Sequence, residues 1–271
     1  MRTAPTTRLA HLPLERRARQ PATEVQLSLV VPIRDEAPNL AELHRRCRAA
    51  LGEALRWELV LVDDGSRDGS DELIRELERL DPRVRGVHFA RHCGQTAAIQ
   101  AGIHASRAPL IATLDGDLQN DPADLAAMLE ALGDNDAVVG YRVRRMDSLV
   151  RRASSRIANS LRNRLSGDSL RDTGCSLKLF RAEAVRSIPL FEGMHRFLPT
   201  LLRFHGYSVI EHPVSHYPRF AGRSKYGIRN RALRAFIDLL AVRWMRSRIV
   251  RPPLASEGLP GRDRANGALR P

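Results

Sequence analysis

Two carboxylates flank a glycine at Asp115-Gly116-Asp117, directly after the apolar run 109–114. This run has the length and composition of a buried strand, so the carboxylates would stand at the carboxyl end of that strand. Carboxylate oxygens suit a hard divalent cation, which a nucleoside diphosphate requires, and glycine lets a ligand approach the backbone closely. A strand-ending turn uses the same residue types, so the triplet alone leaves both interpretations open.

Composition and charge limit the classes of function. The chain has 271 residues, of which 43% are hydrophobic, enough to bury a large core. Its formal charge of +13 and pI of about 11.0 favour anionic partners, namely nucleic acid, an anionic membrane surface or phosphorylated substrates. Aromatic residues make up only 5% of the chain, which argues against a platform for stacking single-stranded bases.

The cysteines and the apolar segments bear on the cellular compartment. Cys47, Cys93 and Cys175 show no C-x-x-C spacing, so we expect free thiols in a reducing cytoplasm. The first twenty residues lack the apolar core of a signal peptide. Five charged residues interrupt the longest membrane-span candidate, 232–250, and each costs about 2.5–3.5 kcal/mol near a bilayer centre. We therefore expect no membrane-spanning helix.

The chain divides into four parts by composition. Residues 1–25 are rich in Arg, Pro, Thr and Ala and are predicted to form a flexible basic arm. Residues 26–228 carry the patterns of one folded domain. A basic amphipathic helix is predicted over 229–250, followed by a disordered tail over 251–271.

Within the domain, apolar runs alternate with segments of helical periodicity. This repetition predicts an α/β fold with a mostly parallel central sheet and helices on both faces. Ser70 or Asp71 is a plausible cap of the second helix, and Asp121-Pro122 opens the fourth. The predicted strands span 27–33, 57–62, 84–89, 110–114 and 136–141, with helices around 40–51, 73–80, 94–106 and after 121.

Polar residues follow each of the five predicted strands. Parallel sheets bind ligands beyond the carboxyl ends of their strands, so these residues predict a binding edge. Neither a P-loop nor a G-x-G-x-x-G motif is present, so a cation and basic side chains would have to neutralise phosphates. In strand order, the polar residues are Arg34, Asp35 and Glu36; Asp63, Asp64 and Ser66; Arg91 and His92; Asp115 and Asp117; and Arg142, Arg144 and Arg145.

Four motifs resemble those of family 2 glycosyltransferases. These are Val30–Glu36, Leu61–Ser70, the D-x-D motif in Leu114–Gln119, and Pro218–Gly227. The last resembles a signature of the polyprenyl-phosphate branch, the dolichol-phosphate mannosyltransferase-like enzymes. The resemblance covers roughly residues 27–245. It implies a GT-A fold with a Rossmann-like nucleotide-binding half, a nucleotide-sugar donor and inversion at the anomeric carbon.

The resemblance also implies roles around the nucleotide. Glu36 and Asp64 would accept hydrogen bonds from the base or ribose, and Pro32, Arg34 and Val62 would surround it. Most family members carry Tyr or Phe at the position of Arg34 and Asn at that of Asp35. Both departures leave the identity of the base open.

The resemblance also implies which residues bind the metal and the phosphates. Asp115 and Asp117 would hold Mg²⁺ or Mn²⁺, which stabilises the departing diphosphate. Asp121 fits a helix cap better than a catalytic role. The remaining site residues implied by the resemblance are Gly116 and Gln119 beside the metal, Arg142 near the phosphates, and Arg219, Ser224 and Lys225 on a basic loop that closes over them.

The acceptor decides between two enzyme hypotheses. A phosphate acceptor is already anionic and needs positive charge, which the arginine-rich segment 142–164 would supply. A hydroxyl acceptor would need a general base, for which Asp172 is the candidate. Asp172 could equally orient a substrate or serve as a structural cap. A third hypothesis, of another class, is a basic nucleic-acid-binding protein. The acidic residues at the predicted binding edge argue against it, because they would repel phosphates.

Our interpretation is a metal-dependent enzyme that transfers a sugar to a polyprenyl phosphate, undecaprenyl or dolichyl, with no specific nucleic-acid partner. Because no span is expected, the helix over 229–250 would bind an anionic membrane surface, although ordinary packing on the sheet is compatible with the same pattern. We expect a cytoplasmic protein at the inner face of the membrane, with a separate membrane-protein partner as a possibility. The amphipathic pattern combines Leu233, Phe236, Ile237, Leu240 and Trp244 with Arg231, Arg234, Arg243 and Arg246.

Overall fold

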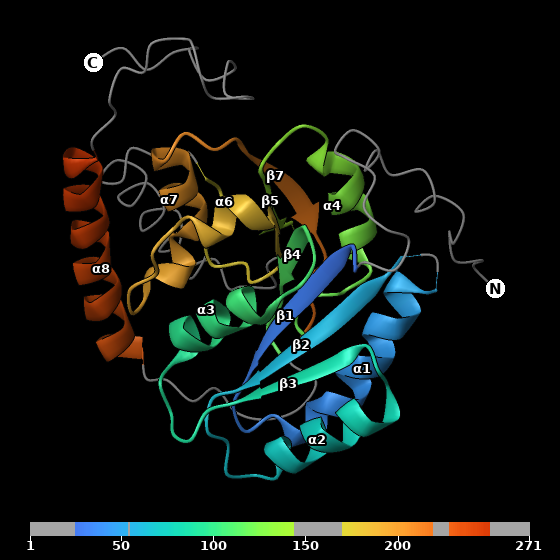
Figure 1. The fold of residues 1–271 in the computed structure, drawn as a ribbon. Helices are drawn as coiled ribbons and strands as arrows, with labels where there is room; N and C mark the ends of the chain where they lie inside the picture. The colour runs from blue at the N-terminus through green and yellow to red at the C-terminus, as the bar shows by residue number, and fades with distance from the viewer. Residues whose placement is uncertain (1–24, 54, 144–169, 219–227, 250–271) are drawn as a thin grey trace.

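The fold is an α/β sandwich built on one sheet, seen in a computed structural model that describes residues 25–53, 55–143, 170–218 and 228–249 (Figure 1). The described strands form a seven-stranded sheet in the order β3-β2-β1-β4-β6-β5-β7. The strands are β1 (Leu27–Ile33), β2 (Trp57–Asp63), β3 (Val84–His88), β4 (Leu110–Thr113), β5 (Ala137–Arg142), β6 (Lys178–Arg181) and β7 (Val209–Val214). The helices are α1 (Ala37–Leu51), α2 (Ser70–Leu80), α3 (Gln95–Ala105), α4 (Asp124–Leu132), α6 (Ala182–Arg186), α7 (Leu198–Phe204) and α8 (Ile228–Arg248), with a 3-10 turn η2 (Met194–Arg196).

Strand direction determines which residues meet at the edge of the sheet. β1 pairs in parallel with β2 and β4, and β5 pairs in parallel with β7. β6 runs antiparallel to both β4 and β5, so it begins at the edge where its neighbours end. Lys178, the first residue of β6, therefore lies beside Thr113, the last residue of β4.

Two hydrophobic clusters cover the two faces of the sheet. One contains Leu40 of α1, Ile74 of α2 and Met128 of α4. The other joins residues of α3, α6, α7 and α8, among them Ile99 and Leu201. The predicted mostly parallel sheet with helices on both faces is confirmed, because both clusters pack on the same seven strands.

Helix α8 is part of this packing. Leu239 and Val242 are buried in the cluster shared with α3 and α7, and Figure 1 shows α8 running beside these helices. The helix predicted over 229–250 thus corresponds to α8, which packs on the domain. The predicted arm, the tail and the segment 144–169 lie outside the described residues.

The predicted strands 27–33 to 136–141 occur as β1–β5, with ends shifted by at most one residue. The cap of α2 differs from the prediction: Gly69 is the N-cap, and the Asp68 carboxylate accepts a hydrogen bond from the N–H of Ser70 at 3.1 Å. Asp121 accepts from the N–H of Ala123 at 3.0 Å, in the turn that leads into α4. The three thiols are free, and burial raises the pKa of Cys47 and Cys175.

Gly102 lets α3 pack closely on the sheet. A Cβ at this position would collide with Cγ1 of Val30 and approach Cγ2 of Val62 to 3.1 Å. Both valines are fully buried in strands, so they have little room to move. This close approach positions the start of α3, which carries Gln95, against the end of β4.

We predict that Gly102→Ala lowers the free energy of unfolding by about 1–3 kcal/mol, because overpacking outweighs the better helix propensity of alanine. Urea unfolding followed by circular dichroism would measure this change. His104→Ala, on the exposed side of α3, is the control and should stay within about 0.5 kcal/mol of wild type. Equal stability of Gly102→Ala and wild type would contradict the close packing.

Candidate active site

Asp115 lies directly beyond β4, where two other elements hold it. Nε2 of Gln95, at the start of α3, donates a hydrogen bond to Oδ1 of Asp115 at 2.9 Å. The backbone N–H of Asp115 donates to Oγ of Ser176 at 3.2 Å, and Ser176 in turn donates to Oδ1 of Asn120 at 3.0 Å. Asp115 is therefore oriented by residues that come from both sides of β4.

The loop after Asp115 holds the second carboxylate at the edge of the sheet. Asp117 is only 8% exposed, and its Oδ1 accepts from the N–H of Gln119 at 3.2 Å. Leu118 between them has a φ of 61°, a conformation that costs a non-glycine residue about 1–2 kcal/mol. The side chain of Leu118 is buried in the core, which stabilises this strained turn. A Cβ on Gly116 would lie 2.7 Å from Cδ1 of Ile33, so this glycine also permits packing on β1.

The same loop is joined to the segment after β7. The N–H of Tyr217 donates to the carbonyl of Gln119 at 2.8 Å, and Nδ2 of Asn120 donates to the carbonyl of Ser215 at 3.4 Å. Ser215 also donates to Asp124 at the start of α4, at 2.7 Å. The chain thus enters the predicted basic loop from a point anchored beside the D-x-D motif. Arg219, Ser224 and Lys225 of that loop lie outside the described residues.

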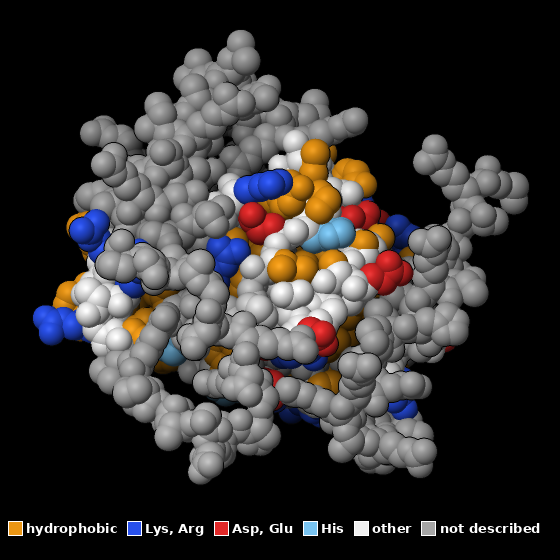
Figure 2. Space-filling view, turned by 90° about the horizontal axis from the view of Figure 1, so that it is seen from above, with side chains coloured by type: hydrophobic (Ala, Val, Ile, Leu, Met, Phe, Trp, Pro, Cys, Tyr) orange, Lys and Arg blue, Asp and Glu red, His pale blue; other side chains and the backbone are white. Residues whose placement is uncertain are grey.

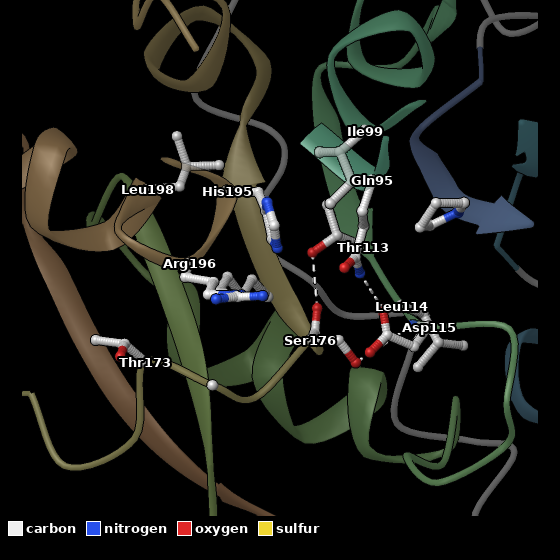
Figure 3. A pocket seen from close by; sticks show the side chains of 13 residues that line it. Gln95, Ile99, Thr113, Leu114, Asp115, Thr173, Ser176, His195, Arg196 and Leu198 are labelled. Atoms are coloured by element: carbon white, nitrogen blue, oxygen red, sulfur yellow. Dashed lines mark hydrogen bonds between the residues drawn. The ribbon is translucent and has the colours of Figure 1, made fainter. Parts of the chain in front are cut away.

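A first pocket of about 110 Å³ opens beside Asp115. Figure 3 shows His195 and Arg196 on one side of this pocket, with Gln95 and Asp115 on the other. Oγ1 of Thr96 accepts from the N–H of Gly193 at 3.0 Å and shares a 2.7 Å hydrogen bond with Nδ1 of His195. The lining residues are Pro32, Gln95, Ile99, Thr113, Leu114, Asp115, Thr173, Gly174, Ser176, Lys178, His195, Arg196 and Leu198.

A second pocket, of about 340 Å³, lies beyond β1, β2 and β3. Arg34 lines it, together with Asp63, Ser66 and residues 89–92. Gly65 also lines it with a φ of 66°, and a Cβ there would lie 2.7 Å from the carbonyl carbon of Arg91. Glycine at position 65 therefore allows the two loops that form the pocket to meet.

Asp64 lines neither pocket and holds the loop that leads into α3. Its buried carboxylate accepts from the N–H groups of Cys93 and Gly94 at 2.6 and 3.1 Å, and contacts Nδ1 of His92 at 2.7 Å. A ligand would have to share these acceptor atoms. Glu36 is the N-cap residue of α1 and accepts from Nδ2 of Asn39, and neither pocket includes it.

Of the predicted site residues that the structure describes, only Pro32, Arg34 and Asp115 line a pocket. Those that line neither pocket are Glu36, Val62, Asp64, Gly116, Asp117, Gln119, Arg142 and Asp172. The Val62 side chain is fully buried in the core against α3, and neither Val62 nor Gln119 is among the residues that line the two pockets. Pro32 and Asp115 line the first pocket and Arg34 the second. The roles given to these residues in substrate binding stay predictions.

Arg142 and Asp172 form an ion pair. Nε and Nη2 of Arg142 donate to the two carboxylate oxygens at 2.7 and 3.0 Å, and the N–H of Gly174 donates to Oδ1 at 3.1 Å. Asp172 is 5% exposed, so the pair is largely buried. Because the carboxylate is engaged by a guanidinium and a backbone N–H, it is poorly placed to act as a general base.

The first pocket contains residues that the sequence reasoning missed. Lys178 lines it and is 6% exposed. Burial lowers the pKa of Lys178 below its ordinary value, and the carboxylates of Asp115 and Asp172 offset this only in part. One sequence signal could have pointed to it: of the 44 lysines and arginines only two are lysines, Lys178 and Lys225. Gln95, Ser176 and His195 gave no comparable signal, because their partners lie far away in the sequence.

The Asp115-Gly116-Asp117 motif and two pockets at the carboxyl edge of an α/β sheet are typical of a nucleotide-dependent transferase. The chain belongs to glycosyl transferase family 2, whose family model matches residues 28–188. It is 42% identical over 239 residues to dodecaprenyl-phosphate galacturonate synthase from Rhizobium johnstonii, covering 86% of this chain and 70% of that protein. It is 39% identical over 205 residues to undecaprenyl-phosphate 4-deoxy-4-formamido-L-arabinose transferase from Edwardsiella ictaluri, covering 74% and 63%.

Solved structures share the fold, which is a GT-A fold. A mannosyltransferase from Pyrobaculum calidifontis in complex with GDP-Man and Mn²⁺ superposes with a TM-score of 0.61 at 21% identity, covering 83% of this chain and 65% of that one. Glucosyl-3-phosphoglycerate synthase from Mycobacterium tuberculosis gives a TM-score of 0.58 at 15% identity, covering 84% and 80%. The chain spans 62–70% of the length of several curated relatives. None of the helices in the described residues is long and apolar enough to cross a bilayer.

The Arg142–Asp172 pair generates a prediction about stability. Asp172→Asn should lower the free energy of unfolding by about 3 kcal/mol, because it leaves a partly buried guanidinium without its counter-charge. Arg142→Met should cost a similar amount, and the double variant should cost less than the sum of the two. Denaturant unfolding of the four proteins would measure this coupling. Additive losses would contradict the pairing.

Proposed function

We propose that the protein transfers a sugar from a nucleoside-diphosphate sugar to a polyprenyl phosphate, with inversion at the anomeric carbon. The observation that carries the proposal is the position of Asp115, which opens the D-x-D loop at the carboxyl edge of the sheet and lines the first pocket. The second pocket, lined by Arg34, Gly65 and Ser66, suits the nucleoside. The acceptor class comes from the two relatives described above, which are named for a dodecaprenyl phosphate and an undecaprenyl phosphate.

The donor set at the sheet edge fits Mg²⁺ or Mn²⁺. Asp115 and Asp117 provide the hard oxygen ligands, and no group of three or more His, Cys, Asp or Glu side chains able to hold a metal occurs in the described residues. Mg²⁺ is commonly bound by one or two carboxylates, with substrate phosphates and water completing its shell. A cation held there would stabilise the negative charge that develops on the departing diphosphate. Gln95 and Ser176 keep Asp115 oriented for this task.

The acceptor chemistry favours a phosphate over a hydroxyl. A hydroxyl acceptor needs a general base, and the candidate Asp172 is engaged by Arg142 and Gly174. A phosphate acceptor is already anionic and requires cationic neighbours. Lys178 and Arg196 in the first pocket are such neighbours.

The described surface also bears on nucleic acid as a partner. In Figure 2, basic side chains on the described part of the face lie beside acidic and hydrophobic ones, without merging into one basic patch. A duplex or single strand would need a continuous cationic path along its phosphates. The described part of this face offers no such continuous path.

Helix α8 supports contact with an anionic membrane surface. Ile237, Leu240 and Trp244 are exposed on it, at 56, 44 and 61%, opposite the buried Leu239 and Val242. Exposed arginines, Arg243, Arg246 and Arg248, flank this apolar row. A helix with exposed apolar and basic side chains binds anionic bilayers, which would bring the protein to the cytoplasmic leaflet and to its acceptor. A membrane-protein partner could occupy the same face.

The catalytic proposal predicts that Asp115→Asn and Asp117→Asn each lower kcat at least about 100-fold, because each removes an oxygen ligand of the cation. Transfer of sugar from a panel of nucleotide sugars to polyprenyl phosphate would be measured with Mn²⁺ and with EDTA. Isothermal titration of Mn²⁺ in the presence of nucleoside diphosphate gives a second readout.

Asp121→Asn is the matched control, since Asp121 lies in the same region and only caps the turn before α4. It should keep near-wild-type kcat. Full activity of both metal-ligand variants in EDTA would refute the metal-dependent mechanism, and transfer to a soluble hydroxyl acceptor alone would refute the acceptor class.

The membrane proposal predicts that the double variant Ile237→Ser, Trp244→Ser binds phosphatidylglycerol vesicles at least about 10-fold more weakly, because burying each side chain contributes about 1.5–3 kcal/mol. Vesicle sedimentation would measure the binding. Leu80→Ser, at the 71% exposed end of α2, is the control and should bind as wild type. Equal binding of the double variant and wild type would exclude this face as the contact.

A further inference from the structure

Lys178 is a buried cation whose partner is not found in the described part of the chain. Its side chain is 6% exposed and lines the first pocket at the start of β6. Among the described residues, the ammonium group makes no hydrogen bond and no ion pair, and the Asp115 and Asp172 carboxylates act on it only at longer range. Because a largely buried charge without a partner costs several kcal/mol in general, an anion that enters the pocket would stabilise this ammonium group.

The chemistry of the pocket shows what the missing partner would be. Arg196 and His195 of η2 lie opposite Asp115 and Gln95 (Figure 3). Lys178, the first residue of β6, lines the same pocket. A guanidinium, an imidazole and an ammonium group are all donors to oxyanions. The Thr96 hydroxyl, which accepts from the Gly193 N–H, shares a hydrogen bond with Nδ1 of His195, so the group is partly preorganised.

We propose that Lys178, with Arg196 and His195, binds an anionic oxygen group of a substrate in the first pocket, beside Asp115. The inference rests on the proposed function and deepens it, because the anionic group has two possible sources there. One source is the carboxylate of a uronic acid carried by the donor, and the other is the phosphate of the polyprenyl acceptor. The group donates hydrogen bonds to the anion and takes no part in bond making.

Lysine is suited to this position for a physical reason. Its ammonium group is a compact point charge with three rotatable donors, whereas the guanidinium of arginine is a rigid planar fork. The chain uses arginine nearly everywhere else, with only two lysines among its 44 basic residues.

The test begins with binding, independent of catalysis. Inorganic phosphate is titrated into the protein in EDTA, and affinity is followed by calorimetry for wild type, Lys178→Met and Lys178→Gln. Each variant should bind phosphate at least about 10-fold more weakly than wild type, the scale of one charge-assisted hydrogen bond. Arg45→Met, which removes one charge on the exposed face of α1, is the matched control and should bind as wild type.

Stability separates a substrate site from a structural role. Lys178→Met should unfold at an equal or higher denaturant concentration than wild type, because it replaces a buried charge with an apolar side chain of similar length. Marked destabilisation of both Lys178→Met and Lys178→Gln, together with unchanged phosphate affinity, would overturn the proposal.

Kinetics identify the source of the anion. If the site takes the sugar carboxylate, Lys178→Met loses kcat/KM with a nucleoside-diphosphate hexuronic acid and keeps it with the matching hexose. If it takes the acceptor phosphate, KM for polyprenyl phosphate rises with both donors. Unchanged phosphate affinity and unchanged kinetics with both donors would refute the site while leaving the proposed function intact. Absence of transfer by wild type would refute the proposed function, and the phosphate titration would still decide the site.

Discussion

The pairing of β6 with β4 is the constraint on which the rest of the site depends. β6 runs against its two neighbours, so its first residues return to the edge where β1, β2 and β4 end. This direction brings Ser176 to the backbone of Asp115 and Lys178 to Thr113. A parallel strand at the same place would begin at the opposite edge and would not bring Ser176 to Asp115.

The same pairing explains why polar residues are buried here at little cost. Asn120 is 5% exposed, yet its side chain bonds to Ser176 on one side and to the carbonyl of Ser215 on the other. Buried polar groups are tolerated when their hydrogen bonds are satisfied, and a satisfied network also fixes the geometry of the loops that carry it. The network joins three loops that are far apart in sequence around one carboxylate. Lys178 lies beside this network without such bonds from the described residues, which is why it stands out from its surroundings.

The parts of the fold that could be predicted from sequence are those whose signal is local. β1 and β2 are continuous apolar runs because both of their faces are buried, and such runs can be read directly. β6 was not predicted because it has only four residues and contains Lys178 and Arg181, so its pattern lacks a long apolar run. The position of Asp115 followed from the end of an apolar run, and the structure places it there.

The partners of the site residues could not be predicted, since they depend on long-range contacts. Asp64 bonds to backbone groups 29 and 30 residues away, and Arg142 to a carboxylate 30 residues away. Residue type alone suggested that Asp64 binds a ligand and that Asp172 accepts a proton as a general base. In the structure, protein groups donate hydrogen bonds to both carboxylates. Sequence patterns identify the edge at which chemistry can occur, and tertiary structure determines which side chains remain available for it.

Helix α8 extends this reasoning from the pocket to the surface. Gly193 precedes the turn that carries His195 and Arg196, and a Cβ there would collide with the carboxylate of Asp238 on α8. The wall of the first pocket therefore rests on the helix whose outer face exposes Ile237 and Trp244. An amphiphilic acceptor must keep its tail in a bilayer while its charged head reaches a pocket. In the proposed function, α8 serves both requirements. Its inner face supports the turn that carries His195 and Arg196, and its outer face meets the membrane surface.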